Sequence, residues 1–374
     1  MKTYPASRPF ISNKDRASVA QVLQTNFLSL GPKYREFEKR FAKRIGTRYA
    51  VSVSSGTAGL HLALLAAGIK SGDEVITTPF SFIASANAIV YTGAKPVFCD
   101  VEIGSGNIDP KNIENKITPR TKALLIVHIF GQPANMKKIM LIAKKHKLKV
   151  IEDACESIDA KHHGRKVGTF GESAVFAFYP NKQMTTGEGG MIVTNSLKIY
   201  ELCASLRNQG RSKSDKWLQH RNLGYNYRMD ELSAALGISQ LSQLTSFIEK
   251  RKQIATWYSN YFKKYFETVQ IPIIDPHNTH TWFVYVIRLK SPKINRDKLI
   301  ERLEKKGIYT KPYLPSIHLS PYYIKKYHYK KGIFPISEKI SKSSLALPLY
   351  IQLNKNDVAY IVKKIISQIK PYEK

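Results

Sequence analysis

The sequence has no uninterrupted run of about 18 apolar residues, the length that a membrane-spanning helix needs. Its first residues, Met1–Arg8, lack the apolar core of a secretion signal, which predicts a cytoplasmic protein with no membrane partner. Only three cysteines occur, Cys99, Cys155 and Cys203, and none belongs to a CxxC pair. This spacing argues against a disulfide framework and against zinc, so we expect no metal.

Acidic residues are scarce: 28 Asp and Glu face 59 Lys and Arg, which gives a formal net charge of +31. Such an excess can indicate a protein that binds nucleic acid. Here the lysines are spread along the chain, and pairs such as Lys144-Lys145, Lys305-Lys306 and Lys363-Lys364 are typical of solvated helix faces. We therefore predict no nucleic-acid partner. A basic nucleic-acid-binding or regulatory protein remains the alternative.

The 374 residues are enough for one large domain and a smaller one. Between Tyr49 and Thr194, strand-like and helix-like stretches alternate. The predicted strands are Glu74–Thr78, Pro96–Asp100, Lys122–His128, Leu148–Glu152, Ala174–Phe178 and Met191–Thr194. The predicted helices between them are Thr57–Ala67, Ser81–Tyr91 and Asn135–Lys145. Alternation of this kind predicts an α/β fold with a mostly parallel sheet covered by helices.

Helical patterns also precede and follow this region, at Asn13–Thr25, Pro32–Ile45 and Met229–Phe266. A strand pattern at Trp282–Lys290 and a helix pattern at Asp297–Lys306 then predict a smaller C-terminal α/β domain. We place the boundary near residue 247, which gives a large domain of residues 1–247 and a small domain of residues 248–374.

One lysine, Lys182, lies in a glycine-rich connector between two of the predicted strands. Backbone without side chains can approach a ligand closely, and a lysine held partly out of water there becomes a nucleophilic amine. The simple alternative is a surface loop that carries one of many lysines. A second motif, Asp153 directly after the strand Leu148–Glu152, favours a ligand, because ligands in open α/β sheets lie beyond the carboxyl ends of the strands.

A lysine and a strand-end aspartate are what a pyridoxal phosphate site needs. The amine binds the cofactor covalently, and the carboxylate keeps the pyridine nitrogen protonated so that the ring accepts electrons. For Asp153 alone, a helix N-cap is the structural alternative. A third segment, Ser55-Gly56-Thr57-Ala58, joins a strand to an apolar helix and can bind a phosphate through N–H groups at the helix start. Its alternative is an ordinary turn capped by serine.

Further segments occur in a characteristic order along most of the chain. They are Phe27-Leu28-Ser29-Leu30-Gly31-Pro32, Thr78-Pro79-Phe80-Ser81-Phe82, Gly131-Gln132-Pro133, Glu152-Asp153-Ala154-Cys155, Leu223-Gly224-Tyr225-Asn226-Tyr227-Arg228-Met229 and Leu345-Ala346-Leu347-Pro348-Leu349-Tyr350. Together with the lysine loop, they resemble the DegT/DnrJ/EryC1/StrS family of sugar aminotransferases. The resemblance implies an aspartate-aminotransferase-like fold, fold type I, with pyridoxal 5'-phosphate as the cofactor.

The resemblance also implies roles for single residues. Lys182 and Asp153 are the catalytic pair, and the phosphate is bound at Gly56, Thr57 and Ala58. Phe82 is expected to stack on the cofactor ring, with core packing as its alternative. Asn226 is expected to reach the phosphate in a neighbouring subunit, which implies a homodimer with shared active sites. Its alternative is a turn residue.

Two positions depart from the family pattern. Many members carry Ser where this chain has Ala177, so the phosphate contact of that hydroxyl must come from another group. Many members carry Gln or His where this chain has Glu156, beside the hydroxyl of the cofactor ring. Both residues are nevertheless expected at the cofactor.

The implied reaction is a ping-pong transamination from L-glutamate to a keto group of a nucleotide-linked sugar. The sugar is expected to be a 4-keto-6-deoxy sugar, made for surface polysaccharides or other amino sugars. Lys182 moves a proton between the donor carbon and the cofactor. The predicted substrate contacts are Thr185, Glu188, Tyr313 and His318, and a buried structural role is the alternative for His318. Some family members are dehydratases with His in place of the lysine, and Lys182 argues against that alternative.

Overall fold

A seven-stranded sheet forms the centre of the computed structural model, which describes residues 2–212, 216 and 219–369. Its strand order is β1-β9-β8-β5-β4-β2-β3. The strands are β1 (Tyr49–Val53), β2 (Glu74–Thr77), β3 (Lys95–Phe98), β4 (Thr121–Val127), β5 (Lys149–Asp153), β8 (Ser173–Ala177) and β9 (Gly190–Thr194). The pairs β3–β2, β2–β4, β4–β5 and β5–β8 are parallel, whereas β9 is antiparallel to both β8 and β1. The predicted mostly parallel sheet is confirmed.

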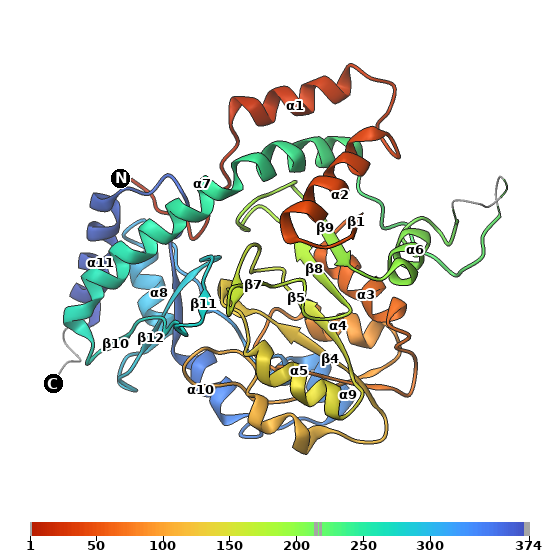
Figure 1. The fold of residues 1–374 in the computed structure, drawn as a ribbon. Coiled ribbons are helices and arrows are strands. Elements are labelled where there is room, and N and C mark those ends of the chain that lie inside the picture. The colour runs from red at the N-terminus through yellow and green to blue at the C-terminus, as the bar shows by residue number, and fades with distance from the viewer. Residues whose placement is uncertain (1, 213–215, 217–218, 370–374) are drawn as a thin grey trace.

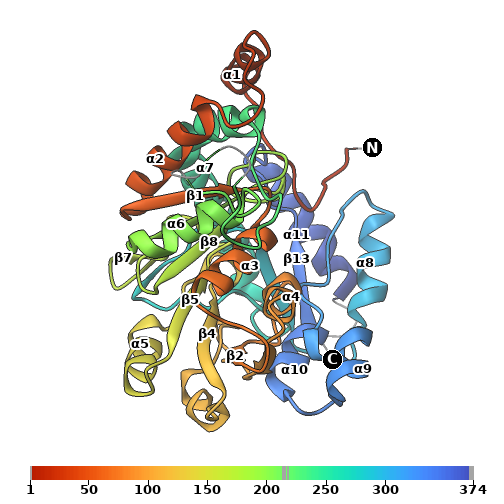
Figure 2. The same cartoon turned by 90° about the vertical axis from the view of Figure 1, so that its right-hand side faces the viewer.

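Helices cover both faces of this sheet (Figures 1 and 2). The helices of this part are α1 (Asn13–Leu23), α2 (Pro32–Ile45), α3 (Gly56–Ala66), α4 (Ala84–Tyr91), α5 (Met136–Lys145), α6 (Leu197–Leu206) and α7 (Glu231–Phe262). Val175 belongs to the core formed with α3 and α6, whereas its neighbours Ala174 and Phe176 belong to the core formed with α2 and α7. This follows from the alternation of side chains along a strand. The helix α6 was not among the predicted elements.

A second, smaller sheet lies at the other end of α7, with strand order β10-β12-β13 (Figure 1). Its strands are β10 (Val269–Gln270), β12 (Tyr285–Leu289) and β13 (Ser344–Leu347). The helices of the C-terminal part are α8 (Arg296–Glu304), α9 (Pro321–Tyr327), α10 (Pro335–Ser343) and α11 (Lys355–Ile369). A third sheet of two-residue strands joins the two parts, because β11 (Asn278–Thr279) pairs with β6 (Lys161–His162), which pairs with β7 (Arg165–Lys166).

Five short 3-10 helices complete the described elements. They are η1 (Pro110–Asn112), η2 (Glu114–Lys116), η3 (Ile129–Gly131), η4 (Lys263–Tyr265) and η5 (Ile317–Leu319). None of the described helices combines the length and the apolar character that crossing a membrane requires.

The predicted domain boundary at residue 247 falls inside the continuous helix α7. Leu244 packs in the core of the large sheet, whereas Ile254 and Tyr258 pack in the core of the small sheet. Tyr4 also packs in the second core and forms a parallel bridge with Ile308, so the start of the chain contacts the small sheet. The change of packing along α7 is compatible with a division near residue 247, which stays a prediction.

Close packing of α2 against α7 leads to a stability prediction. A methyl group at Gly237 would lie 2.7 Å from the ring of Phe37, which is fully buried. Gly→Ala in a helix normally stabilises a protein by about 1 kcal/mol. We expect Gly237→Ala instead to lower the free energy of unfolding by about 1–3 kcal/mol, because the core would be overpacked.

Denaturant unfolding measures this difference. Ser246→Ala, at an exposed position of the same helix, is the matched control and should change the free energy of unfolding by no more than about 0.5 kcal/mol. A Gly237→Ala variant as stable as the parent protein would contradict the close contact between α2 and α7.

Candidate active site

The candidate site lies where β5, β8 and α3 meet. Asp153 ends β5, Ala177 ends β8, and Gly56 begins α3. A Cβ atom at Gly56 would lie 2.7 Å from the Cβ of Ala177 and 3.0 Å from the Sγ of Cys155. The three segments are therefore in close contact, and glycine is the residue that this approach permits.

The start of α3 has the geometry of an anion site. The Oγ of Ser55 accepts a hydrogen bond from the Ala58 N–H at 3.1 Å, as expected of an N-cap. The N–H groups of Gly56 and Thr57 belong to the first turn, so no earlier helical carbonyl can accept from them, and the positive end of the helix lies there. The serine cap of the alternative reading is therefore present together with donors that suit a phosphate.

Asp153 is buried and already holds hydrogen bonds suited to a carboxylate. The Ser85 hydroxyl donates to Oδ2 at 2.6 Å, and the Cys155 N–H donates to Oδ1 at 3.2 Å. The Oγ atoms of Ser81 and Ser85 lie 2.9 Å apart. Since Ser85 uses its proton toward Asp153, Ser81 donates to Ser85. Residues 154–160 form turns, so Asp153 does not cap a helix and that alternative is excluded.

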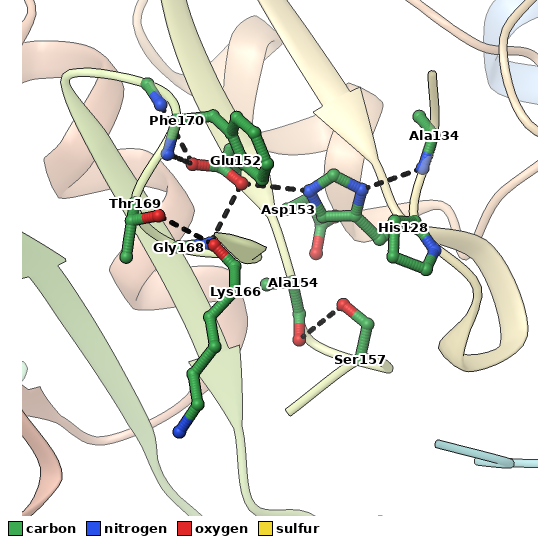
Figure 3. A network of polar contacts seen from close by, with 12 residues as sticks. His128, Ala134, Glu152, Asp153, Ala154, Ser157, Lys166, Gly168, Thr169 and Phe170 are labelled. Carbon is green, nitrogen blue, oxygen red and sulfur yellow. Dashed lines mark hydrogen bonds and ion pairs between the residues drawn. The ribbon is translucent and has the colours of Figure 1, made fainter. Parts of the chain in front are cut away.

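The preceding residue, Glu152, holds the end of β5 in place from the opposite face (Figure 3). Its carboxylate accepts hydrogen bonds from the N–H groups of Gly168, Phe170 and Gly171 at 2.8–2.9 Å. It also lies 3.1 Å from Nε2 of His128, whose Nδ1 accepts from the Ala134 N–H. Nε2 therefore carries the ring proton and donates to Glu152. This network fixes the strand end that carries Asp153.

Lys182 points inward rather than into solvent, which excludes the simple surface-loop alternative. Its Nζ lies 3.6 Å from Oε1 of Glu156 and 4.0 Å from the ring centroid of Phe283, and its side chain is 13% exposed. Glu156 is influenced by the charges of both Lys182 and Asp153. The amine and the carboxylate that the sequence predicted are thus brought to the same region.

Glu156 is a buried carboxyl group under opposing influences. Burial raises its pKa, and the charge of Lys182 and a hydrogen bond from the Phe130 N–H at 2.9 Å lower it. Tyr313 is the one small-domain substrate prediction that lies here. Its ring centroid is 6.0 Å from that of Phe130 and 6.3 Å from that of Phe283. Burial and the charge of Glu156 raise the pKa of the Tyr313 hydroxyl.

Other predicted residues lie in contrasting environments. Phe82 is 61% exposed, which excludes core packing within this chain. Asn226 and Glu188 are exposed. Thr185 is buried, and its hydroxyl donates to the Phe178 carbonyl at 2.9 Å and accepts from the Gly187 N–H, so it holds the loop together.

The structure does not bring His318 to Lys182. The imidazole is fully buried beside Phe334, and its Nε2 lies 3.1 Å from Glu338. Burial lowers the pKa of His318, and Glu338 opposes that shift. This environment corresponds to the structural alternative for that histidine.

Sequence reasoning did not identify Ser85, Phe130 and Phe283. Ser81 lies in the Thr78–Phe82 motif and Ser85 follows it, but Ser81 precedes α4, so helical spacing does not account for their contact. Phe283 lies 101 positions from Lys182 and meets it only through the tertiary fold, so no local signal existed.

The arrangement fits pyridoxal phosphate. Lys182 supplies an amine, Asp153 a hydrogen-bonded carboxylate, and the first turn of α3 backbone N–H donors at a helix start. This donor set contains the groups that cofactor needs for its aldehyde, ring nitrogen and phosphate.

Comparisons with known proteins agree with this chemistry. A sequence model described as the DegT/DnrJ/EryC1/StrS aminotransferase family matches residues 9–366. The chain is 40% identical to an uncharacterized protein of Methanocaldococcus jannaschii, covering 97% of this chain and 98% of that one. It is 38% identical to GDP-perosamine synthase of Escherichia coli O157:H7, with 98% of both chains covered. The solved structure of S. venezuelae DesV superposes with a TM-score of 0.90 at 33% identity, covering 97% of this chain and 98% of that one. The predicted fold type I is confirmed.

Glu156 gives a pH prediction. Because burial raises its pKa in the folded state, the folded protein holds this proton more tightly than the unfolded chain does. The resulting stabilisation is complete below the unfolded value near 4.5 and is lost as the pH rises through the raised pKa. We expect the stability of Glu156→Gln, relative to the parent protein, to improve as the pH rises from about 4.5 and then to level off. Urea unfolding of both proteins across pH 4–8 measures it, and a pH-independent difference would contradict the raised pKa.

Proposed function

Because the chain belongs to the DegT/DnrJ/EryC1/StrS aminotransferase family and is a pyridoxal-phosphate-dependent sugar aminotransferase, we propose that it moves an amino group from L-glutamate to a keto group of a nucleotide-linked sugar. The observation that carries the assignment of the site is the inward Lys182 amine, 3.6 Å from Glu156, in the region that also holds Asp153.

Pyridoxal phosphate, when bound, supplies an electron sink that stabilises negative charge on the carbon that loses a proton. Lys182 would hold the cofactor covalently and, once released, would carry the proton on Nζ between the donor carbon and the cofactor. Asp153 would face the ring nitrogen and keep it protonated, while the hydrogen bond from Ser85 holds the carboxyl group in place. Glu156 would face the ring hydroxyl.

The remaining cofactor contacts follow from the geometry of the site. The first turn of α3, at Gly56, Thr57 and Ala58, would bind the phosphate, and Ala177 would lie beside it without a hydroxyl of its own. The exposed side chain of Phe82 suits stacking on the ring.

The sugar would enter from the side of Glu188 and Tyr313, with Thr185 supporting the loop. The similarity to a GDP-perosamine synthase supports a nucleotide-linked sugar. The narrower form of the proposal is a 4-keto-6-deoxy sugar, in the synthesis of surface polysaccharides such as lipopolysaccharide. The net charge of +31 would attract such an anionic substrate.

A homodimer completes the proposal. Leu28, Phe82 and Leu223 are 52%, 61% and 87% exposed, so large apolar groups lie uncovered on the surface of a single copy. A second copy of the chain would cover them and bring Asn226 of the partner subunit to the cofactor phosphate. The dehydratase alternative is not favoured, because Lys182 is present where those enzymes have His.

The substrate proposal is tested by incubating the purified protein with L-glutamate and each member of a set of keto-sugar nucleotides. We expect 2-oxoglutarate to form over repeated turnovers with at least one 4-keto-6-deoxy sugar nucleotide, whereas glutamate alone should release no more than the single equivalent per site that the cofactor can accept. Lys182→Ala should abolish the reaction, because the amine moves the proton and holds the cofactor. Turnover retained by Lys182→Ala would refute the role assigned to it, and repeated turnover without a sugar nucleotide would refute the acceptor class.

The shared site is tested by mixing two variants that each lack one proposed site residue, Lys182→Ala and Asn226→Ala, under conditions that exchange subunits. Each hybrid dimer would contain one complete site, with Lys182 from one copy and Asn226 from the other. Random exchange should then restore about a quarter of the parent activity per chain. No gain on mixing, with exchange verified by mass, would show that Asn226 does not act across an interface.

A further inference from the structure

Arg251 is a buried cation on α7 that has no carboxylate partner among the residues described by the structure. Arg251 is only 4% exposed. Its three hydrogen bonds go to backbone carbonyls: Nη2 donates to Lys182 at 3.1 Å, and Nη1 donates to Phe283 at 3.1 Å and to Trp282 at 3.3 Å. A cation placed out of water without an opposite charge is costly, so its retention needs a reason.

Two of the three carbonyls that Arg251 holds belong to Lys182 and Phe283, whose side chains meet in the site. The ammonium of Lys182 lies 4.0 Å from the ring centroid of Phe283, a distance typical of a cation–π contact. One planar guanidinium thus sets the separation of both backbones, with donors in a fixed fork. A flexible ammonium at the same position could not hold three carbonyls in this way.

The segment that carries Phe283 also needs support, because its backbone is strained. Trp282 has a φ of 52°, in the left-handed region that bulky residues avoid. Phe130, which faces it, has a φ of 60°. The Phe283 N–H donates to the Phe130 carbonyl at 3.1 Å, which holds one side of the segment. Conformations of this kind persist only where several contacts define them, and the guanidinium supplies the contacts on the other side.

We propose that Arg251 is a positioning residue for the transamination: it joins the lysine loop to the Trp282–Phe283 segment and so fixes the Lys182 amine against the Phe283 ring. The inference rests on the proposed role of Lys182. Arg251 acts through backbone carbonyls and need not touch the substrate. It connects the half of α7 beyond residue 247 to the loop after β8, so it also sets how the small sheet lies against the reacting amine.

The test measures how fast Lys182 captures an aldehyde in the full-length protein freed of cofactor. Pyridoxal, which lacks the phosphate, is the probe, because its capture does not depend on the anion site at α3. The bond is reduced with borohydride at timed intervals, and the labelled residue is found by mass spectrometry. The variants are Arg251→Met, Arg251→Lys, Phe283→Leu and the double variant Arg251→Met/Phe283→Leu. Arg44→Lys is the control for a partly buried arginine elsewhere, since Arg44 pairs with Asp159.

We expect Arg251→Met to slow the labelling of Lys182 by roughly tenfold, because the amine is no longer held in one geometry. Arg251→Lys should recover only part of the rate, and Arg44→Lys should keep the parent rate. The double variant should be no slower than the slower single variant, because both changes remove the same arrangement. If Arg251→Met does not fold, Arg251→Lys takes its place in the cycle.

Two results would overturn the inference: a labelling rate for the Arg251 variants equal to that of the parent, or effects of Arg251 and Phe283 that multiply independently. A different result tests the underlying proposal. Label found on a lysine other than Lys182 in the parent protein would refute the role of Lys182 and leave nothing for Arg251 to position.

Discussion

The contact between the Lys182 ammonium and the buried carboxyl of Glu156 is the interaction on which the site depends. The two side chains are 13% and 8% exposed, and their 3.6 Å approach offsets part of the cost of burying them. The Phe283 ring also contacts the amine, with its centroid 4.0 Å from Nζ. A lysine in this position is enclosed beside a carboxyl group, whereas the many surface lysines are surrounded by water.

Successive residues of β5 divide the work of holding the site. Because side chains alternate along a strand, Glu152 and Asp153 point to opposite faces of the sheet. Glu152 is satisfied by three backbone N–H groups and His128, so it fixes the strand end. Asp153 lies on the face of the sheet that α3 covers, and it accepts a hydrogen bond from the Ser85 hydroxyl. Glu152 thus has a structural role, whereas the adjacent Asp153 is the carboxylate with a proposed role in the reaction.

Arg251 and Lys182 would divide a structural and a chemical role in the same way. The amine would do the chemistry, and a buried guanidinium that reaches only carbonyls would set where the amine lies. Phe82 and Leu223 are exposed apolar side chains, and the second copy in the proposed homodimer would cover them.

The sequence by itself determined the sheet, its parallel core and the two segments that carry Lys182 and Asp153. Strand periodicity and glycine-rich turns are local properties, and the predicted strand Leu148–Glu152 differs from the observed β5 (Lys149–Asp153) by one residue at each end. Only the tertiary structure decided that His318 is enclosed beside Glu338, that the Thr185 hydroxyl is used within its own loop, and that Phe283 and Arg251 hold the lysine. These contacts join residues up to 101 positions apart in the chain, and whether such side chains meet depends on how the two sheets pack across α7, which no local pattern records.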